Sequence, residues 1–495
     1  MADSNSFRST GRRFAGLVLS FIMILCSLAL TSCHRDDGDF PDIGSPDSGE
    51  GTYSSEGSEK TDSESEMTAE DSSGNYRSIT VALPYSQSTV NYLSELYYVK
   101  NNDLMTEGDN GGNISLEYLD SIQTPWFINS IQTSMSGVDT TTLAEWSESG
   151  FMPDIYLAED IRSMVDGGYA LPLQELLADS ELIGNSNLFS KVMDTMTLDG
   201  TIYGIPHYST AVILAINLDY LPNSGVLDYI YTPEDLRTFL QAMSDKALEA
   251  ENSSEANTAG ELVPFAEAYD LIPYIAPSIS GRNYSYMLFD EYHNGNTSVA
   301  TTAVGSIVRY CDELYDLGLS SDTDSAGNDP VADRVAGMWM LSSSQIDDFN
   351  SYYPGRVYYL PLPSYDHETA SSPMLTVYPL CLASGCENAD FAADFAAFIS
   401  LDPDAQLLIR RLEPKNGYYP LIRNAAVWLD LADETDNGRI ASFYEMSMDT
   451  AVYCPGNNGS GLYSAVNSYI SDYSLRRSDE GETAVFNLQE CYGGY

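Results

Sequence analysis

Basic side chains are scarce in this sequence. Its 495 residues include 22 Lys and Arg against 73 Asp and Glu, which gives a formal net charge of −51 at pH 7. Binding to a phosphate backbone needs a positively charged face. The composition therefore argues against a nucleic-acid partner. Acidic surfaces repel one another, so we also expect a monomer.

Histidine is equally rare, and the motifs of common enzymes are missing. The four histidines are scattered along the chain, at His34, His207, His293 and His367. A histidine-rich metal site or a Ser-His-Asp triad is therefore not expected. The sequence also lacks G-x-S-x-G, H-E-x-x-H, Walker and G-x-G-x-x-G motifs. We predict a protein that is not an enzyme and needs no cofactor or metal.

The seven cysteines do not form a disulfide framework. Cys26 and Cys33 lie in the N-terminal region, and the remaining five are odd in number and widely spaced: Cys311, Cys381, Cys386, Cys454 and Cys491. No C-x-x-C pair occurs, which argues against a zinc ribbon. A bond between Cys454 and Cys491 stays open.

One acidic segment resembles a calcium-binding loop. In Asp322–Asp333, oxygen ligands stand at positions one and three, Gly327 at position six and a carboxylate at position twelve. Ala326 at position five, and Asp rather than Glu at position twelve, favour a solvated acidic loop instead. Calcium binding remains an alternative for this loop.

The N-terminal region has the pattern of an export signal. Three arginines precede an apolar run, Phe14–Leu30, which is shorter than a typical membrane span. From His34 onward the chain is rich in Asp, Glu, Ser and Gly and has too few apolar groups to form a core. We predict a signal peptide at residues 1–33 and a disordered acidic tether at residues 34–76.

Strand and helix patterns alternate after the tether. Strands are expected at Ser78–Leu83, Ile114–Leu119 and Met152–Leu157, and helices at Val90–Val99 and Ile161–Asp166. This alternation predicts an α/β unit with a largely parallel sheet.

A polar loop leads into the most apolar short segment of the body. The continuous run Val212–Ile216 is typical of a strand that is buried on both faces. The polar and aromatic residues His207–Thr210 come just before it. Asp160 lies between a predicted strand and a predicted helix, where ligands bind in α/β sheets. An N-cap is the simpler explanation for an Asp in that position.

Four segments in order resemble the extracellular solute-binding proteins of bacterial ABC importers, in particular the sugar-binding group called family 1. The segments are P-D-I-Y-L at 153–157 with G-Y-A-L-P-L at 168–173, D-G-T-I-Y-G-I-P at 199–206 through N-L-D at 217–219, F-A-A-D-F at 391–395 with L-D-P-D-A-Q at 401–406, and G-Y-Y-P at 417–420. Before them, L-T-S-C at 30–33 resembles the lipobox of bacterial lipoproteins.

The resemblance implies a periplasmic-binding-protein-like α/β fold with two lobes, a hinge and a ligand cleft between the lobes. Residues 77–211 plus 375–425 would form lobe 1, and residues 212–374 plus 426–495 lobe 2. Chain crossings are expected near Val212–Ile216, Leu375–Pro379 and Tyr419–Arg423.

The resemblance also implies the site and the cellular location. The ligand-binding candidates are Asp160, His207, Tyr208, Thr210, Tyr378 and Tyr463. Lipidation of Cys33 would hold the protein at the extracytoplasmic face of the cell membrane, where it would deliver its solute to an ABC transporter permease.

Several functions stay open at this point. A sugar or oligosaccharide suits tyrosine faces and a carboxylate that accepts hydrogen bonds from hydroxyl groups. An acidic cleft would instead suit a polyamine or another cation. A lipid-anchored glycan hydrolase with a pair of carboxylates, and an adhesion or sensor protein that has lost transport, are further alternatives.

Overall fold

The computed structural model describes residues 77–178, 180–184, 188–189, 191–221, 230, 232–252, 262–280, 295, 303–363, 373–432, 438–455, 461–480 and 484–491. All of them belong to one compact unit, Thr68–Tyr495. The predicted signal peptide, Cys33 and the whole predicted tether lie outside the described residues, which begin at Arg77.

The described strands are β1 (Arg77–Leu83), β2 (Trp126–Gln132), β3 (Ile155–Leu157), β4 (Thr197–Leu198), β5 (Thr201–Ile202), β6 (Ile205–Asn217), β7 (Val263–Ala266), β8 (Ser320–Ser321), β9 (Ala336–Ser342), β10 (Val357–Pro361), β11 (Met374–Leu382), β12 (Tyr419–Pro420) and β13 (Val452–Pro455).

The described α-helices are α2 (Gln87–Asn101), α3 (Leu116–Asp120), α4 (Thr140–Glu148), α5 (Ile161–Asp166), α6 (Glu181–Gly184), α7 (Val192–Thr195), α8 (Pro233–Asn252), α9 (Leu271–Ser280), α11 (Ala303–Asp316), α12 (Ile346–Tyr352), α13 (Ala389–Leu401), α14 (Pro403–Leu412), α15 (Ala425–Ala432), α16 (Gly438–Ser447), α17 (Gly461–Glu480) and α18 (Leu488–Cys491). Short 3-10 turns are η1 (Leu218–Tyr220), η2 (Ala268–Asp270) and η4 (Ser343–Gln345).

The sheet is mixed, with parallel groups at its two ends. Its main path runs β2-β1-β3-β11-β6-β9-β7-β8. The pairs β1–β2 and β1–β3 are parallel, as expected for the first unit, and so are β7–β9 and β7–β8. The central pairs β3–β11, β11–β6 and β6–β9 are antiparallel. "Largely parallel" therefore describes only the edges of the sheet.

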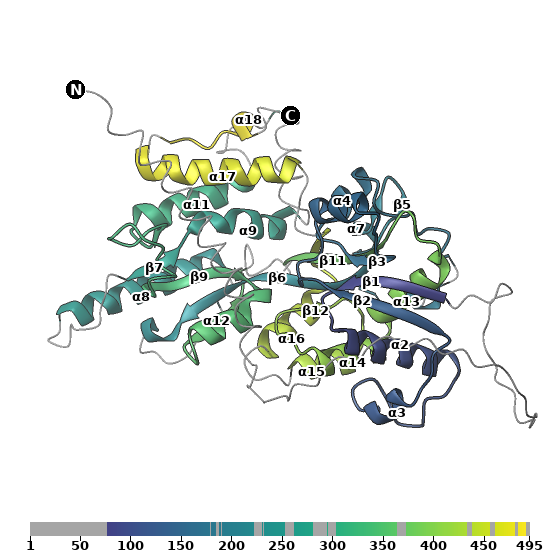
Figure 1. Ribbon diagram of the computed structural model, residues 1–495. Coiled ribbons are helices and arrows are strands. Elements are labelled where there is room, and N and C mark those ends of the chain that lie inside the picture. Colours follow the sequence, from purple (N-terminus) through teal and green to yellow (C-terminus); the bar gives the residue numbers. More distant parts are fainter. Residues whose placement is uncertain are drawn as a thin grey trace, which may run out of the picture. The chain divides into compact units, whose positions relative to one another are not determined.

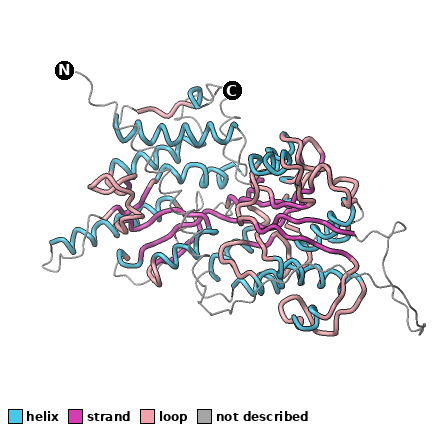
Figure 2. The backbone as a smooth tube through the Cα atoms, in the orientation of Figure 1, coloured by secondary structure: helices cyan, strands magenta, loops and turns pink. Residues whose placement is uncertain are grey.

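Strand β6 joins the two groups of strands (Figures 1 and 2). Its first half, Ile205–Ala211, pairs with β11, and Val212–Ile216 pairs with β9. Apart from Val212, every residue of β6 is buried, which confirms the predicted strand buried on both faces. The loop predicted at His207–Thr210 is wrong, because these residues already belong to β6. Strand β12 pairs with β6 at Ser209 and Tyr208, so β11 and β12 both pair with the half of β6 that precedes Val212–Ile216.

The prediction of a strand at Ile114–Leu119 is wrong. The segment forms helix α3, and the next strand is β2, which the sequence pattern did not reveal. Ser115 caps the helix by accepting a hydrogen bond from the backbone N–H of Tyr118 at 3.3 Å. Ile114 and Leu119 flank the first turn and are both buried, as in a hydrophobic staple. Capping therefore outweighed the alternating apolar pattern.

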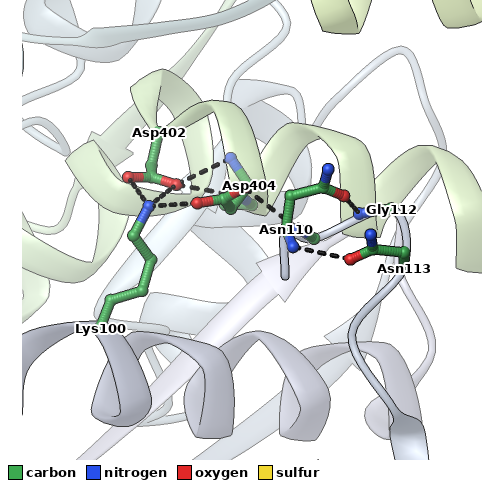
Figure 3. A network of polar contacts seen from close by, with 8 residues as sticks. Lys100, Asn110, Gly112, Asn113, Asp402 and Asp404 are labelled. Carbon is green, nitrogen blue, oxygen red and sulfur yellow. Dashed lines mark hydrogen bonds and ion pairs between the residues drawn. The ribbon is translucent and has the colours of Figure 1, made fainter. Parts of the chain in front are cut away.

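A half-buried lysine holds helix α14 in place (Figure 3). The Lys100 ammonium, near the end of α2, lies 2.8 Å from Asp402 Oδ2 and 2.6 Å from Asp404 Oδ2. Asp402 is also the N-cap of α14, and Asp404 Oδ1 accepts from the backbone N–H of Gly111 at 3.1 Å. These contacts fix the start of the helix whose later turns line the candidate site.

Within the described residues, no helix combines the length and the apolar character needed to cross a bilayer.

Candidate binding site

The carboxyl ends of three parallel strands lie side by side. Leu83, the last residue of β1, is paired with Gln132 at the end of β2, and Ala82 is paired with Tyr156 of β3. Ligands of α/β proteins bind at such an edge because the loops that follow the strands converge there. Here the loops supply Tyr85 after β1, Met135 after β2 and Asp160 after β3.

A small hollow, partly open to solvent, lies beside this edge. It is lined by Tyr85, Met135, Tyr208, Gln406, Ile409, Arg410, Glu413, Lys415, Tyr418, Tyr419 and Pro420. Strand loops, strand β6, helix α14 and the segment that enters β12 thus all contribute to one concave surface.

Tyr208 is the sequence-predicted residue that lines the hollow. Its phenol O–H donates to the backbone carbonyl of Met135, and the side chain is only 5% exposed. Burial raises the pKa of this phenol well above its ordinary value, so the group keeps its proton. Tyr208 is therefore a neutral residue of the wall whose O–H is already engaged by the protein.

Two tyrosine rings pack against the ring of Tyr208. The ring of Tyr378, opposite it on β11, lies 5.2 Å away between centroids at 36°, and the ring of Tyr418 lies 5.1 Å away at 88°. Burial raises the pKa of Tyr418 to about 12, which keeps this phenol neutral. Of these partners Tyr418 lines the hollow and Tyr378 supports it from the core.

His207 lies behind the hollow rather than in it. The side chain is 1% exposed and burial lowers its pKa to about 3, so the imidazole is neutral at physiological pH. Its Nε2 is 2.6 Å from the Tyr85 hydroxyl and its Nδ1 is 3.0 Å from Ser400 Oγ. Both ring nitrogens are thus occupied by the protein.

Asp160 is the N-cap of helix α5. Its carboxylate accepts from the backbone N–H groups of Arg162 at 3.3 Å and Ser163 at 3.1 Å, and from the Ser163 hydroxyl at 2.5 Å. The residue is buried and does not line the hollow.

Of the other two candidates, Thr210 is not among the residues that line the hollow. Thr210 is buried on β6, opposite Thr376 of β11. Tyr463 falls on helix α17, and its side chain lies outside the described part of the chain.

Sequence reasoning missed most of the hollow's wall. Tyr85 could have been found, because it follows β1 and Pro84 at a parallel strand end, and Tyr418 lies in the G-Y-Y-P segment. The residues of α14 carry no local signal, since they reach Tyr85 only through the packing of α14 against α2.

The charged groups of the hollow are two cations and one engaged carboxylate. Glu413 Oε1 accepts from the backbone N–H of Ser86 at 3.1 Å and from the Thr89 hydroxyl at 2.8 Å. Arg410 and Lys415 supply the positive charges. In a chain with three times as many acidic as basic residues, this hollow is unusually short of free carboxylates.

The acidic loop 322–333 holds its carboxylates with protein donors. Asp322 accepts from the Ser474 hydroxyl at 2.7 Å, and Asp324 accepts from the backbone N–H groups of Ala326 and Asn328 at 2.9 and 2.8 Å. Across the described ranges, no three His, Cys, Asp or Glu side chains come together in a way that could hold a metal ion. Cys491 is a free, buried thiol, and the side chain of Cys454 is not among those described.

Several solved structures share this fold at low sequence identity. A sugar transporter from Rhizobium etli in an open conformation has a TM-score of 0.57 and 15% identity, over 84% of this chain and 98% of that one. An ABC substrate-binding protein from Listeria monocytogenes, solved with cycloalternan, has a TM-score of 0.56 and 14% identity, over 84% and 97%. The sugar-binding protein MalE from Xanthomonas citri gives 0.56 and 14%, over 84% and 95%.

These likenesses establish the fold as the periplasmic-binding-protein type, in agreement with the sequence prediction. Among curated protein sequences, none matches the chain. The family of bacterial extracellular solute-binding proteins matches residues 140–428, more than half of the sequence. The chain therefore belongs to the bacterial extracellular solute-binding proteins.

Proposed function

We propose that this protein is a lipid-anchored receptor that binds a sugar or oligosaccharide outside the cell and delivers it to an ABC transporter permease. The observation that carries the proposal is the hollow at the carboxyl edge of β1 and β2, walled by Tyr85, Tyr208 and Tyr418. Aromatic walls with a few placed polar groups suit the mixed apolar and hydroxyl surface of a sugar ring. The solved structures that share this fold and belong to proteins of sugar binding or transport support this ligand class.

The charges of the hollow favour a sugar over a polyamine. A polyamine needs free carboxylates, whereas Glu413 is engaged by Ser86 and Thr89 and stands near Arg410 and Lys415. A hydroxyl group both donates and accepts, so it can satisfy tyrosine oxygens on one wall and cationic donors on the other.

The crossing of β6, β11 and β12 would serve as the hinge between the two lobes assigned from the sequence. Ser343, from the turn after β9, accepts from the backbone N–H of Ala211 at 3.0 Å and donates to the carbonyl of Gly417. Asn416 donates to Asp347 at 2.7 Å. These contacts connect the segment before β12 to both β6 and η4. A movement of one crossing would therefore shift the others.

A thermal-shift screen of the chain against neutral sugars, oligosaccharides, polyamines and amino acids tests the proposal. A ligand at 100 times its dissociation constant adds about 2.7 kcal/mol to the free energy of unfolding. We expect stabilisation by one class of sugar. Stabilisation by polyamines alone would overturn the ligand class, and turnover of a glycan would overturn the non-enzymatic assignment.

The lipid anchor needs its own test. Metabolic labelling with a tritiated fatty acid should label the wild-type chain and leave a Cys33→Ala variant unlabelled and released from the membrane fraction. Equal labelling of both chains would contradict an anchor on Cys33.

A further inference from the structure

Three buried polar side chains connect the wall of the hollow to helix α13. Tyr85 is 3% exposed, and His207 and Ser400 are each 1% exposed. The Tyr85 hydroxyl lies 2.6 Å from His207 Nε2, and His207 Nδ1 lies 3.0 Å from Ser400 Oγ. The two rings meet edge to face, with centroids 5.8 Å apart at 72°. Of the three residues, Tyr85 lines the hollow.

Both rings are neutral at physiological pH. Burial lowers the pKa of His207 to about 3 and raises that of Tyr85. A neutral imidazole has one N–H donor and one bare nitrogen that accepts. The two hydrogen bonds that link Tyr85, His207 and Ser400 can therefore run in one of two directions. Either Tyr85 donates to Nε2 and Nδ1–H donates to Ser400, or Ser400 donates to Nδ1 and Nε2–H donates to Tyr85.

The two distances favour the first direction. N–H···O bonds in proteins centre near 2.9–3.0 Å, whereas hydroxyl donors give shorter bonds, near 2.7–2.8 Å. The 3.0 Å contact to Ser400 fits an Nδ1–H donor, and the 2.6 Å contact fits the Tyr85 O–H as donor. A phenol is also a stronger acid than an imidazole N–H, which favours the same assignment.

This direction decides what the hollow presents to a ligand. Because the Tyr85 proton points to His207, the lone pairs of the phenol oxygen are what remains for the hollow. Tyr208 is in the same state, since its O–H donates to the Met135 carbonyl. Two tyrosine oxygens on one wall therefore act as acceptors.

We propose that His207 is a positioning residue that holds Tyr85 as a hydrogen-bond acceptor, so that this wall of the hollow selects ligand hydroxyls that donate. The inference rests on the proposed function, because it assumes that the hollow binds the solute. His207 itself does not touch the ligand.

The first test needs no ligand. The chain has four histidines, so selective ¹⁵N-histidine labelling gives few imidazole signals, and the His207 signals are those lost in His207→Gln. We expect a proton on Nδ1, a bare Nε2, and a shift of the Nε2 resonance in Tyr85→Phe. A proton on Nε2, or an Nε2 resonance that is the same in Tyr85→Phe, would overturn the inference.

The second test separates positioning from packing. In His207→Gln the amide oxygen can take the place of Nε2 and accept from Tyr85, whereas in His207→Asn the amide reaches only the place of Nδ1. With mannobiose and maltotetraose as probes, we expect affinity within about threefold of wild type for Gln, and a loss of about tenfold for Asn and for Tyr85→Phe. Equal losses in Gln and Asn would overturn the positioning role.

The two proposals can fail separately. A wild-type chain that binds neither probe contradicts the proposed function for these sugars, and the imidazole spectrum then decides the inference alone. A wild-type chain that binds a probe but carries the proton on Nε2 keeps the function and refutes the role of His207.

Discussion

Tyr208 and Tyr378 face each other across the β6–β11 pair, with ring centroids 5.2 Å apart and planes inclined by 36°. One ring lines the hollow and the other packs in the core behind it. The position of Tyr208 in the wall of the candidate site therefore depends on the position of β11, which carries Tyr378.

Replacing Tyr208 should weaken binding as well as stability, because its buried ring packs against Tyr378 and Tyr418. Tyr208→Ala removes the aromatic wall and should weaken the best sugar of the screen by more than tenfold, about 1.4 kcal/mol, as measured by calorimetry. Tyr208→Phe keeps the ring and should lose less. Tyr352→Ala, at an exposed tyrosine outside the hollow, is the control. Equal affinity in wild type and Tyr208→Ala would remove Tyr208 from the site.

Asp160 should act mainly as a helix cap. Asp160→Ala removes three hydrogen bonds at the start of α5 and should lower the free energy of unfolding by about 1 kcal/mol in a urea titration. Asp160→Asn can still cap the helix and should retain most of this stability. A tenfold loss of sugar affinity in Asp160→Asn would show that the carboxylate also contacts the ligand.

Glu95 should make the protein less stable as pH rises. Burial, with Asp120 nearby, raises the pKa of this carboxyl to about 7, and its Oε2 is buried without a hydrogen-bond partner among the described residues. The folded state therefore keeps a proton that the unfolded state releases near pH 4.5. The stabilisation is complete below that value and is lost as pH rises to about 7.

Glu95→Gln tests this pH dependence. The variant is neutral at all pH values, so it should gain stability over wild type at pH 8 and little at pH 4, measured by urea denaturation. Glu107→Gln, at an exposed carboxyl, controls for the general relief of charge repulsion. The idea fails if both variants gain equally at pH 8.

Gly417 should tolerate no side chain. Its φ is +77°, and a Cβ there would lie 1.8 Å from the backbone oxygen of Ser343. Gly417→Ala should therefore cost more than about 2 kcal/mol of stability in a thermal melt. Gly355 has a φ of +65° with open space around it, so Gly355→Ala should cost only about 1 kcal/mol. Similar costs for both would refute the close approach of Gly417 to the backbone of Ser343.

The sequence was informative where the signal is local. The apolar run Val212–Ile216 predicted a strand buried on both faces, and Asp160 before a short helix predicted a cap. The segment Ile114–Leu119 misled because an alternating pattern and a capped turn look alike over six residues.

The candidate site was harder to predict, because its wall is assembled from distant segments. Tyr208 was identified from its place before the apolar run Val212–Ile216, but Glu413 contacts Ser86 across more than three hundred residues. Nothing near Glu413 in the sequence indicates this contact. The burial of His207 was also not visible, since its partners Tyr85 and Ser400 come from two other elements.

The pairing of β11 has a consequence for how the chain folds. Strands β3 and β6 both pair with residues near position 380, and β6 also pairs with β12 at Tyr419. During synthesis, β3 and the first half of β6 therefore remain without these partner strands until about two hundred more residues have been made. Such high contact order predicts slow folding, and a chain truncated before Met374 would expose unpaired edges of β3 and of the first half of β6 to aggregation.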